Sequence, residues 1–264
     1  MTGNGDDHAL SEDKLFRVIQ LHAAVSRRKA HELVAAGEVT IDGEAVVDPF
    51  AILDPSQTGT VRVRGHPISL APREHRAYRF HKPKGMLCSH DDPHCGDTVG
   101  RVLRADGFLG YNWAGRLDQD AEGLLVVSND GRLIERLTHP RYEIEKIYRV
   151  RLARPPSPKR LAAALDEMRS GIEDQGETLR IVGGKPARGG KTVEVTLAEG
   201  KKHEIKRLFG HFDLRIAALK RIAVGPVRLG SLPPGTFARI EGDEAAALAR
   251  IVVGNTRPPS DCRS

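Results

Sequence analysis

The sequence predicts an α+β fold in two parts, a small N-terminal block and a larger block built on a mixed, mostly antiparallel β-sheet flanked by helices. Up to about residue 75, two segments with helical periodicity precede two short strand pairs. Beyond that point, segments with strand periodicity outnumber helices and often follow one another directly. Hydrophobic residues make up 39% of the 264 residues, which is enough for a sizeable core.

The first block begins with two predicted helices. Ser26 is a natural N-cap for the second helix, and Gly37 is a natural end for it. The apolar residues then alternate across an Asp42-Gly43 pair, which is a strong hairpin signal. The predicted elements are helices over 14–25 and 26–37, a hairpin over 39–46 and a strand pair over 59–70.

The second of these helices starts with a concentration of positive charge. Arg27, Arg28 and Lys29 crowd its first turn, where the helix dipole favours negative side chains. A phosphate bound there would meet both the cations and the free backbone N–H groups. The pattern therefore favours an anion-binding helix start, and the alternative is a solvated charged face.

The second block mixes strands and helices. Its helix over 157–171 is clearly marked, because Ser157 can cap it, Pro158 suits its first position and Gly171 can end it. Strands are expected at 77–85, 123–127, 143–152, 191–200 and 237–240, and further helices at 132–140, 203–212 and 244–254.

The charge distribution indicates a polyanionic partner. Residues 1–13 hold four acidic and no basic side chains, which leaves 41 basic and 31 acidic side chains, a net charge of +10, on the rest. A body this basic is expected to attract nucleic acid, and the alternative is a merely soluble basic protein. We expect 1–13 and 254–264 to be disordered tails, because they are small, polar or proline-containing.

Composition argues against a membrane-spanning protein and favours the cytosol. No apolar run approaches the ~20 residues of a spanning helix, and the first residues lack the features of a signal peptide. The cysteines Cys88, Cys95 and Cys262 are odd in number and widely spaced, which is typical of reduced thiols in a cytosolic protein.

Two motifs resemble ligand sites but do not meet their requirements. The stretch GGKPARGGKT at 183–192 lacks a glycine at Lys185, where a phosphate-binding loop needs one, and a strand rather than a helix follows it. The stretch CSHDDPHC at 88–95 offers four zinc ligands with irregular spacing and no second pair. We therefore expect a polar loop there, and no metal site.

The stretch GRLDQDAEGLLVV places Asp118 on a glycine-flanked loop directly ahead of a buried strand. Such a carboxylate can be rigid and exposed at once, and Arg116 could keep it ionised or reach a substrate phosphate. Taken alone, the segment is also typical of a turn carboxylate that caps its own backbone. Four other segments strengthen the functional interpretation: HKPKG at 81–85, HPRYEIEKIYRV at 139–150, EGKKHEIKRLFGHF at 199–212 and LKRIAVGPVRLGSLPPGTF at 219–237.

In this order the motifs resemble those of the RsuA/RluB family of pseudouridine synthases, over residues 14–241. Residues 14–62 are similar to the αL-type, S4-like RNA-binding module that a small-subunit ribosomal protein shares with tyrosyl-tRNA synthetases. The resemblance implies an S4-like domain over 14–75, which binds RNA through Arg27, Arg28 and Lys29, and a pseudouridine synthase catalytic domain over 76–253. The implied substrate is a uridine in ribosomal RNA.

The resemblance also implies roles for single residues. Asp118 matches the catalytic nucleophile, Tyr148 the aromatic residue that stacks on the target uracil, and Lys206 the cation that pairs with the aspartate. Leu219 matches an apolar residue lining the pocket, and Arg116 a residue near the space left by the flipped base. Four further cations of these motifs are expected to contact RNA: Lys82, Lys84, Lys202 and Arg207. The sequence departs from the family pattern at Ala121, where a threonine is usual.

The implied chemistry agrees with these residue types. Moving uracil from an N–C to a C–C linkage loses no atom and changes no oxidation state, so it needs no cofactor. It does need a carboxylate that a nearby cation keeps ionised, a pocket that excludes water, and an aromatic platform for a base drawn from its stack.

Other functions stay open from the sequence. One is an RNA-binding or ribosome-assembly protein without catalysis, and another is an N-glycosidase that uses Asp118 and Asp120 as a carboxylate pair. Within the favoured class, the segment RLTHPRYEIEKIYRV resembles the large-subunit (23S) branch more than the small-subunit (16S) branch. We expect a monomer that acts on ribosomal RNA or pre-ribosomal particles, away from membranes.

Overall fold

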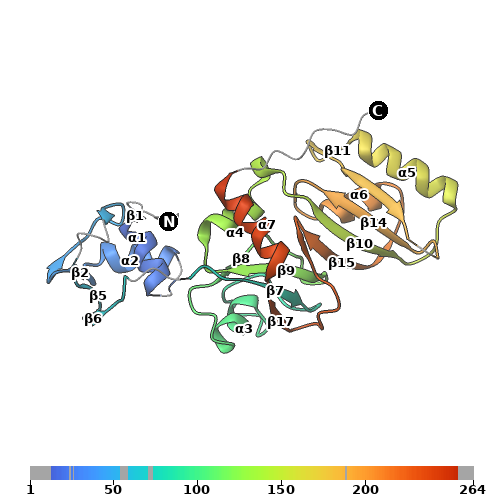
Figure 1. The fold of residues 1–264 in the computed structure, drawn as a ribbon. Coiled ribbons are helices and arrows are strands. Elements are labelled where there is room, and N and C mark those ends of the chain that lie inside the picture. Colours follow the sequence, from blue (N-terminus) through green and yellow to red (C-terminus); the bar gives the residue numbers. More distant parts are fainter. Residues whose placement is uncertain are drawn as a thin grey trace, which may run out of the picture. The chain divides into compact units, whose positions relative to one another are not determined.

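The computed structural model describes residues 13–23, 25, 27–53, 59–70, 74–187 and 189–254. They form two compact units (Figure 1). The N-terminal unit reaches to Glu74 and also includes Phe108–Tyr111, and the main unit consists of the other residues from His75 onward. The two tails predicted to be disordered lie outside the described residues, apart from Asp13 and Gly254.

The N-terminal unit packs two helices against short strands. Both predicted helices and the predicted hairpin are confirmed, and Gly37 ends the second helix with a φ of 69°. The predicted N-cap, Ser26, lies outside the described residues. The elements are β1 (Asp13–Lys14), α1 (Leu15–His22), α2 (Arg27–Ala35), β2 (Val39–Ile41), β3 (Glu44–Ala45), β4 (Ile52–Leu53), β5 (Val61–Val63) and β6 (His66–Pro67).

The main unit is built on one large mixed sheet. Its neighbours β9 and β15 run parallel, whereas all its other strand pairs among the described residues are antiparallel, which confirms the predicted sheet. The strands in spatial order are β13 (Gly183–Pro186), β14 (Thr192–Leu197), β10 (Lys146–Leu152), β15 (Ile216–Val224), β9 (Glu122–Ser128), β7 (Ala77–Lys82) and β17 (Phe237–Arg239). Beside them lie β8 (Asn112–Trp113), β16 (Val227–Arg228) and a hairpin of β11 (Ile172–Asp174) and β12 (Glu177–Leu179).

Helices flank this sheet. α4 (Gly131–Thr138) and α7 (Gly242–Val253) pack together beside β9 (Figure 1). α5 (Pro158–Ser170) lies against β13. The start of α5 is as predicted, since the Arg160 N–H donates to Ser157 Oγ at 3.3 Å. The other helices are α3 (Val99–Ala105), α6 (Glu204–His211) and the 3₁₀ turn η1 (Pro140–Tyr142). No helix in the described ranges is both long and apolar enough to cross a bilayer.

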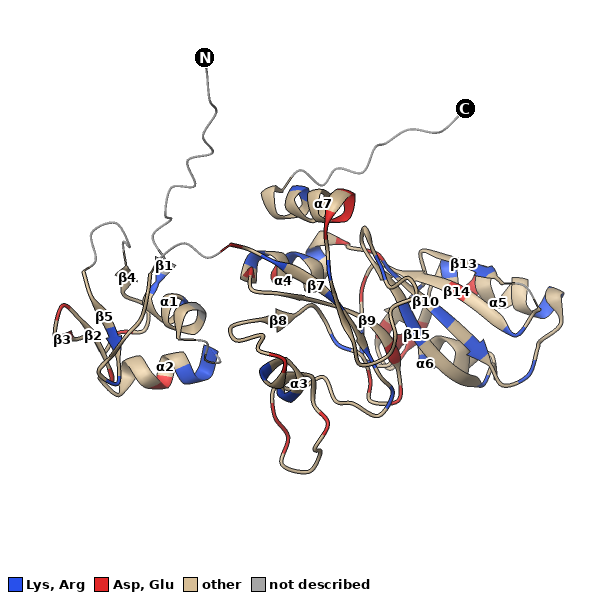
Figure 2. Cartoon of the chain, turned by 60° about the horizontal axis from the view of Figure 1, so that its bottom comes forward, with Lys and Arg blue, Asp and Glu red and all other residues tan. Residues whose placement is uncertain are grey.

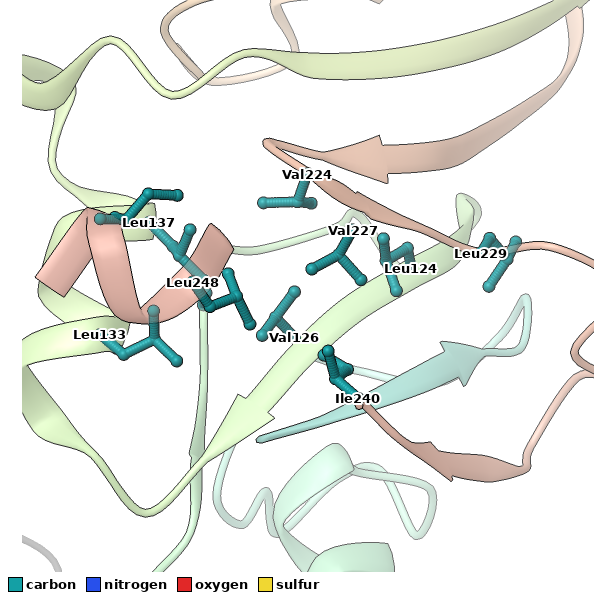
Figure 3. Close-up of a cluster of buried hydrophobic side chains, with 11 residues drawn as sticks. Leu124, Val126, Leu133, Leu137, Val224, Val227, Leu229, Ile240 and Leu248 are labelled. Carbon is teal, nitrogen blue, oxygen red and sulfur yellow. The ribbon is translucent and has the colours of Figure 1, made fainter. Parts of the chain in front are cut away.

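A buried cluster joins segments that are far apart in the sequence (Figure 3). Its members come from β9, α4, β15, β16, α7 and their connections: Ala114, Leu124, Val126, Leu133, Leu137, Val224, Val227, Leu229, Ile240, Leu248 and Ile251. Burial of each large apolar side chain contributes ~1.5–3 kcal/mol. The cluster therefore anchors β9, the strand into which the Asp118 loop leads.

The structure also contains elements that the sequence patterns did not predict. The long strand β15 lies in the middle of the sheet, between β10 and β9. Within the glycine-rich stretch at 183–192, Gly183–Pro186 form β13, which pairs antiparallel with β14 at the edge of the sheet, whereas a phosphate-binding loop would lead into a helix.

Candidate active site

Five residues singled out in the sequence line one pocket of the main unit: Arg116, Asp118, Tyr148, Lys206 and Leu219. The pocket encloses about 80 Å³. Its remaining lining combines apolar with charged or polar positions: Leu117, Ala121, Leu197, Gly200, Lys201, His203, Glu204 and Ile205. Residues that are a hundred positions apart in the chain thus meet at one place.

The order of the central strands explains this convergence. Asp118 stands just ahead of β9, Leu219 lies on β15 and Tyr148 on β10, and these three strands are neighbours in the sheet. Tyr148 pairs across the strands with Arg221 of β15 and Val195 of β14. Alternate residues of β10 are buried, so Tyr148 shares a face with Lys146 and Val150.

Lys206 contacts two carboxylates just ahead of the first residue of β9. Lys206 Nζ lies 2.9 Å from Asp118 Oδ2 and 2.6 Å from Asp120 Oδ1. Burial disfavours the charge of Lys206, but its hydrogen bonds to Asp120 and Asp118 outweigh burial and raise its pKa. The hydrogen bond from Lys206 also lowers the pKa of Asp120. The side chains of Asp118 and Lys206 are 33% and 31% exposed, so solvent screens their attraction only in part.

A histidine that sequence reasoning missed also faces the aspartate. His203 Nε2 lies 3.5 Å from Asp118 Oδ1, an ion pair whenever the imidazole is protonated. Its backbone is left-handed, with a φ of 54° and a ψ of 26°, directly before α6. Such a conformation is uncommon for residues other than glycine and clusters at functional sites. The sequence placed His203 inside the predicted helix, which hid the orientation of its side chain.

The expectation that Lys82 contacts RNA is wrong. Its side chain is fully buried, and its ammonium group donates to the carbonyl oxygens of Ala121 at 2.7 Å and Pro83 at 3.0 Å. Burial lowers the pKa of Lys82. Lys82 therefore holds the loop of Asp118 from inside the protein. Ala121, the position that departs from the family pattern, is buried and supplies one of these carbonyl groups.

Arg221 holds the same loop from β15. Its side chain is 1% exposed, and it donates from Nε to the Leu124 carbonyl at 2.8 Å and from Nη1 to the Arg116 carbonyl at 3.2 Å. Two buried cations thus bind main-chain carbonyl groups on both sides of Asp118. Arg221 lies between the buried residues Leu219 and Ala223 on one face of β15, a strand that the sequence patterns did not predict.

A glycine lets the two central strands approach each other at this point. Gly123 pairs with Arg221 across the parallel β9–β15 contact and has a φ of 122°. A Cβ atom at residue 123 would lie 2.3 Å from the Arg221 carbonyl oxygen, which is far inside van der Waals contact. The position of the Asp118 loop therefore depends on glycine at residue 123.

The other expected RNA contacts divide into two groups. The Arg207 guanidinium pairs with Asp174 and with Glu177 at 2.7 Å and so holds the β11–β12 hairpin, and its contact with RNA stays a prediction. Lys84 and Lys202 are exposed in the main unit, and their contact with RNA stays a prediction.

In the N-terminal unit, the first turn of α2 is strongly basic (Figure 2). Arg27 and Arg28 are exposed, and Lys29 is half-buried. Arg28 and Lys29 each lie 3.4 Å from Glu32 one turn further on. Their contact with RNA likewise stays a prediction.

Comparisons with known proteins identify the family. Residues 77–211 match the family described as RNA pseudouridylate synthase. The chain belongs to this family. An uncharacterized RNA pseudouridine synthase of Aquifex aeolicus is 33% identical over 92% of this chain and 96% of its own length. A pseudouridine synthase is an isomerase, so the chain is an RNA-modifying enzyme.

Named relatives of this pseudouridine synthase include both ribosomal types. The ribosomal small subunit pseudouridine synthase A of Vibrio cholerae is 32% identical over 84% of this chain and 94% of its own length. The ribosomal large subunit pseudouridine synthase B of Vibrio vulnificus is 30% identical over 91% and 75%. A crystal structure described as a pseudouridylate synthase superposes with a TM-score of 0.60 at 26% identity, covering 90% of this chain and 98% of that one. The resemblance to the RsuA/RluB family is thereby confirmed.

Proposed function

We propose that this pseudouridine synthase isomerises one uridine of large-subunit (23S) ribosomal RNA, with Asp118 as the catalytic nucleophile. The observation that carries the proposal is the 2.9 Å pair between Lys206 Nζ and Asp118 Oδ2 in a pocket that Tyr148 and Leu219 also line. Ribosomal RNA as the substrate is supported by the named relatives. The choice of the large subunit rests on the segment RLTHPRYEIEKIYRV at 136–150 and on the compact C-terminal part of the sequence.

The reaction balances without any further reactant. The C1′–N1 bond of uridine breaks, the uracil turns, and a C1′–C5 bond forms, while N1 gains a proton and C5 loses one. The Asp118 carboxylate enters the reaction ionised, attacks the sugar or stabilises its intermediate, and is released unchanged. Lys206 keeps a positive charge beside it throughout, because the pKa of Lys206 is raised.

The remaining pocket residues fit the handling of a flipped base. Tyr148 lines the pocket and is only 7% exposed, so its surroundings hold the ring in place. A ring fixed at the pocket wall is a suitable platform for the uracil to stack on. Leu219 and Ala121 make part of the lining apolar, which helps to keep water away from the detached base. Arg116, exposed at the rim, is placed to occupy the space that the base leaves in the RNA.

The geometry argues against a glycosidase that uses Asp118 and Asp120. A general acid needs a raised pKa, whereas the hydrogen bond from Lys206 lowers the pKa of Asp120. Asp120 is also 62% exposed and shares its lysine with Asp118. An intact, rearranged nucleoside is therefore the expected product, without free uracil.

The N-terminal unit is proposed to be an S4-like RNA-binding domain over 14–75, ahead of a catalytic domain over 76–253. Its support is the order of two helices and a hairpin, together with the basic first turn of α2. In this arrangement Arg27, Arg28 and Lys29 contact the RNA backbone.

Mapping of pseudouridine in ribosomal RNA tests the proposal. In cells that lack this protein, one site in 23S RNA is expected to disappear, and the intact gene should restore it. Asp118→Asn should not restore it, because the amide cannot act as a nucleophile. Asp166→Asn, the same change on the exposed face of α5, is the matched control and should restore it.

Each result has a defined meaning. Loss of a site from 16S RNA instead would show that the substrate is the small-subunit RNA. An unchanged set of sites in both RNAs would show that the ribosomal assignment is wrong, and full activity of Asp118→Asn would remove Asp118 from its role.

A further inference from the structure

Phe50 is an exposed aromatic residue of the N-terminal unit. The Phe50 residue is 52% exposed, although its ring centre lies 5.7 Å from that of Phe16 and 5.3 Å from that of His31. Phe16 is buried and stacks on His31 at 4.3 Å. The two inner rings therefore support Phe50 on one side while much of it stays open to solvent.

Hydrogen bonds hold the backbone of Phe50 in place. The Phe50 N–H donates to Asp48 Oδ1 at 2.9 Å. On either side, the Phe16 N–H donates to the Pro49 carbonyl at 3.0 Å and the Leu15 N–H to the Ala51 carbonyl at 2.7 Å. These last two donors belong to the first turn of α1 and have no acceptor within the helix. Because the turn is fixed, a ligand that binds Phe50 has little ordering cost to overcome.

Cations surround this aromatic cluster. Lys14 Nζ lies 5.2 Å from the centre of the Phe50 ring, and Arg27 Cζ lies 5.0 Å from the centre of the Phe16 ring. Residues 13–74 carry eight basic and eight acidic side chains, yet five of the basic ones stand between Lys14 and Lys29, where no acidic residue occurs. Two of these five cations, Lys14 and Arg27, thus lie against the aromatic cluster.

Resting on the proposed function, we propose that this surface, formed by Phe50, Lys14 and Arg27, binds an unpaired nucleotide of the RNA. The base stacks on the open face of the Phe50 ring, and the neighbouring phosphates pair with Lys14 and Arg27. A nucleotide has a flat base, which can stack on the aromatic ring, and a negatively charged phosphate, which can pair with the cations. Double-stranded RNA keeps its bases stacked inside the helix and cannot use the ring.

Binding of the full-length protein to a short single-stranded oligouridine tests this inference. Fluorescence anisotropy is measured at a salt concentration that weakens purely electrostatic binding, so that stacking dominates. Phe50→Leu keeps the apolar contact with Phe16 and His31 but removes the aromatic face, and it should weaken binding about 10- to 100-fold. Phe50→Tyr keeps the ring and should bind like the wild type. Duplex RNA of equal length should bind both variants equally well.

Cation variants give a second, independent measurement. Lys14→Gln with Arg27→Gln should reduce the steepness with which oligouridine affinity falls as salt rises, since two phosphate contacts are lost, whereas Phe50→Leu should leave that slope unchanged. Equal oligouridine affinity for the wild type and Phe50→Leu would overturn the inference. So would a change confined to self-association in sedimentation, because the surface would then serve a protein partner.

The outcome can be separated from that of the proposed function. Asp118→Asn should form no pseudouridine, and adding Phe50→Leu to it should weaken oligouridine binding, relative to Asp118→Asn alone, by the same factor as in the otherwise unchanged protein. Failure of pseudouridine mapping with a positive binding result rejects the proposed function alone. The reverse combination rejects the role of Phe50 alone.

Discussion

Replacing Lys206 by methionine removes the positive charge from the active site but keeps a side chain of similar length. The wild-type cluster of Asp118, Asp120 and Lys206 carries one net negative charge. The variant carries two negative charges, and it lacks the ammonium group that lies 2.9 Å from Asp118 Oδ2 in the wild type. It must also receive a polyanionic substrate, so both chemistry and RNA binding should suffer.

The size of the loss follows from the distance. Two unit charges 2.9 Å apart attract each other by about 6 kcal/mol at an effective dielectric constant of ~20. Because both side chains are about one-third exposed, solvent screening reduces the usable part to roughly 2–3 kcal/mol. At ~1.4 kcal/mol per factor of ten, kcat/KM should fall about 30- to 150-fold.

Release of tritium from ribosomal RNA labelled at uridine C5 measures this loss, because C5 exchanges its hydrogen for the sugar when pseudouridine forms. Single-turnover conditions isolate the chemical step. Lys206→Arg keeps the charge and should retain most of the activity. Asp120→Asn leaves the pair of Lys206 with Asp118 in place and should lose far less than Lys206→Met.

A folded Lys206→Met enzyme with wild-type single-turnover rates would refute the electrostatic reasoning. So would a loss of equal size in Lys206→Arg, since shape rather than charge would then matter. Circular dichroism and thermal unfolding establish that each variant is folded.

Three further changes test other parts of the structure. His203→Asn tolerates the left-handed backbone but removes the imidazole beside Asp118, so the rate should fall ~3- to 10-fold at an unchanged melting temperature; an unchanged rate would leave His203 without a role. Gly123→Ala places a Cβ 2.3 Å from the Arg221 carbonyl oxygen and should lower the free energy of unfolding by ~3 kcal/mol or more in urea titrations; an unshifted midpoint speaks against this strain. Burial lowers the pKa of Lys146 from 10.5 to about 8, so the unfolded chain binds more protons between these values and stability should rise with pH across this window. Below pH 8 the cost of burying the charged Lys146 amounts to about 3 kcal/mol. Lys146→Met should recover this stability at pH 7 but not near pH 10. A stability difference between variant and wild type that does not change with pH would contradict this reasoning.

The elements with local signals were predictable from the sequence. α5 starts at the Ser157 cap and ends at Gly171, where the backbone turns to a φ of 102°. Strands with one buried face, such as β10, alternate as expected. β15 was missed because Lys220 and Arg221 interrupt its apolar pattern, although Arg221 is buried. Its burial depends on the partner strands, which the segment itself does not specify.

The candidate site was predictable as a set of residues but not in the role of each cation. In a strand with one buried face, Lys82 and His81 would point to opposite sides, and only one of them would be buried. The last three residues of β7 are all buried, so the sequence pattern could not show that Lys82 is inside the protein. Lys206 and Arg207 are neighbours on α6, but one side chain reaches Asp118 and the other the β11–β12 hairpin. That hairpin was not predicted, so the partner of Arg207 could not be foreseen.

The core cluster of Figure 3 has a consequence for biosynthesis. Six of its eleven members come from residues 224–251, so the covering of β9, the strand that follows Asp118, is complete only after residue 251 has been translated. A nascent chain paused earlier has β9 without the side chains that cover it. A chain that stops before residue 224 should therefore leave β9 partly uncovered and should not form pseudouridine.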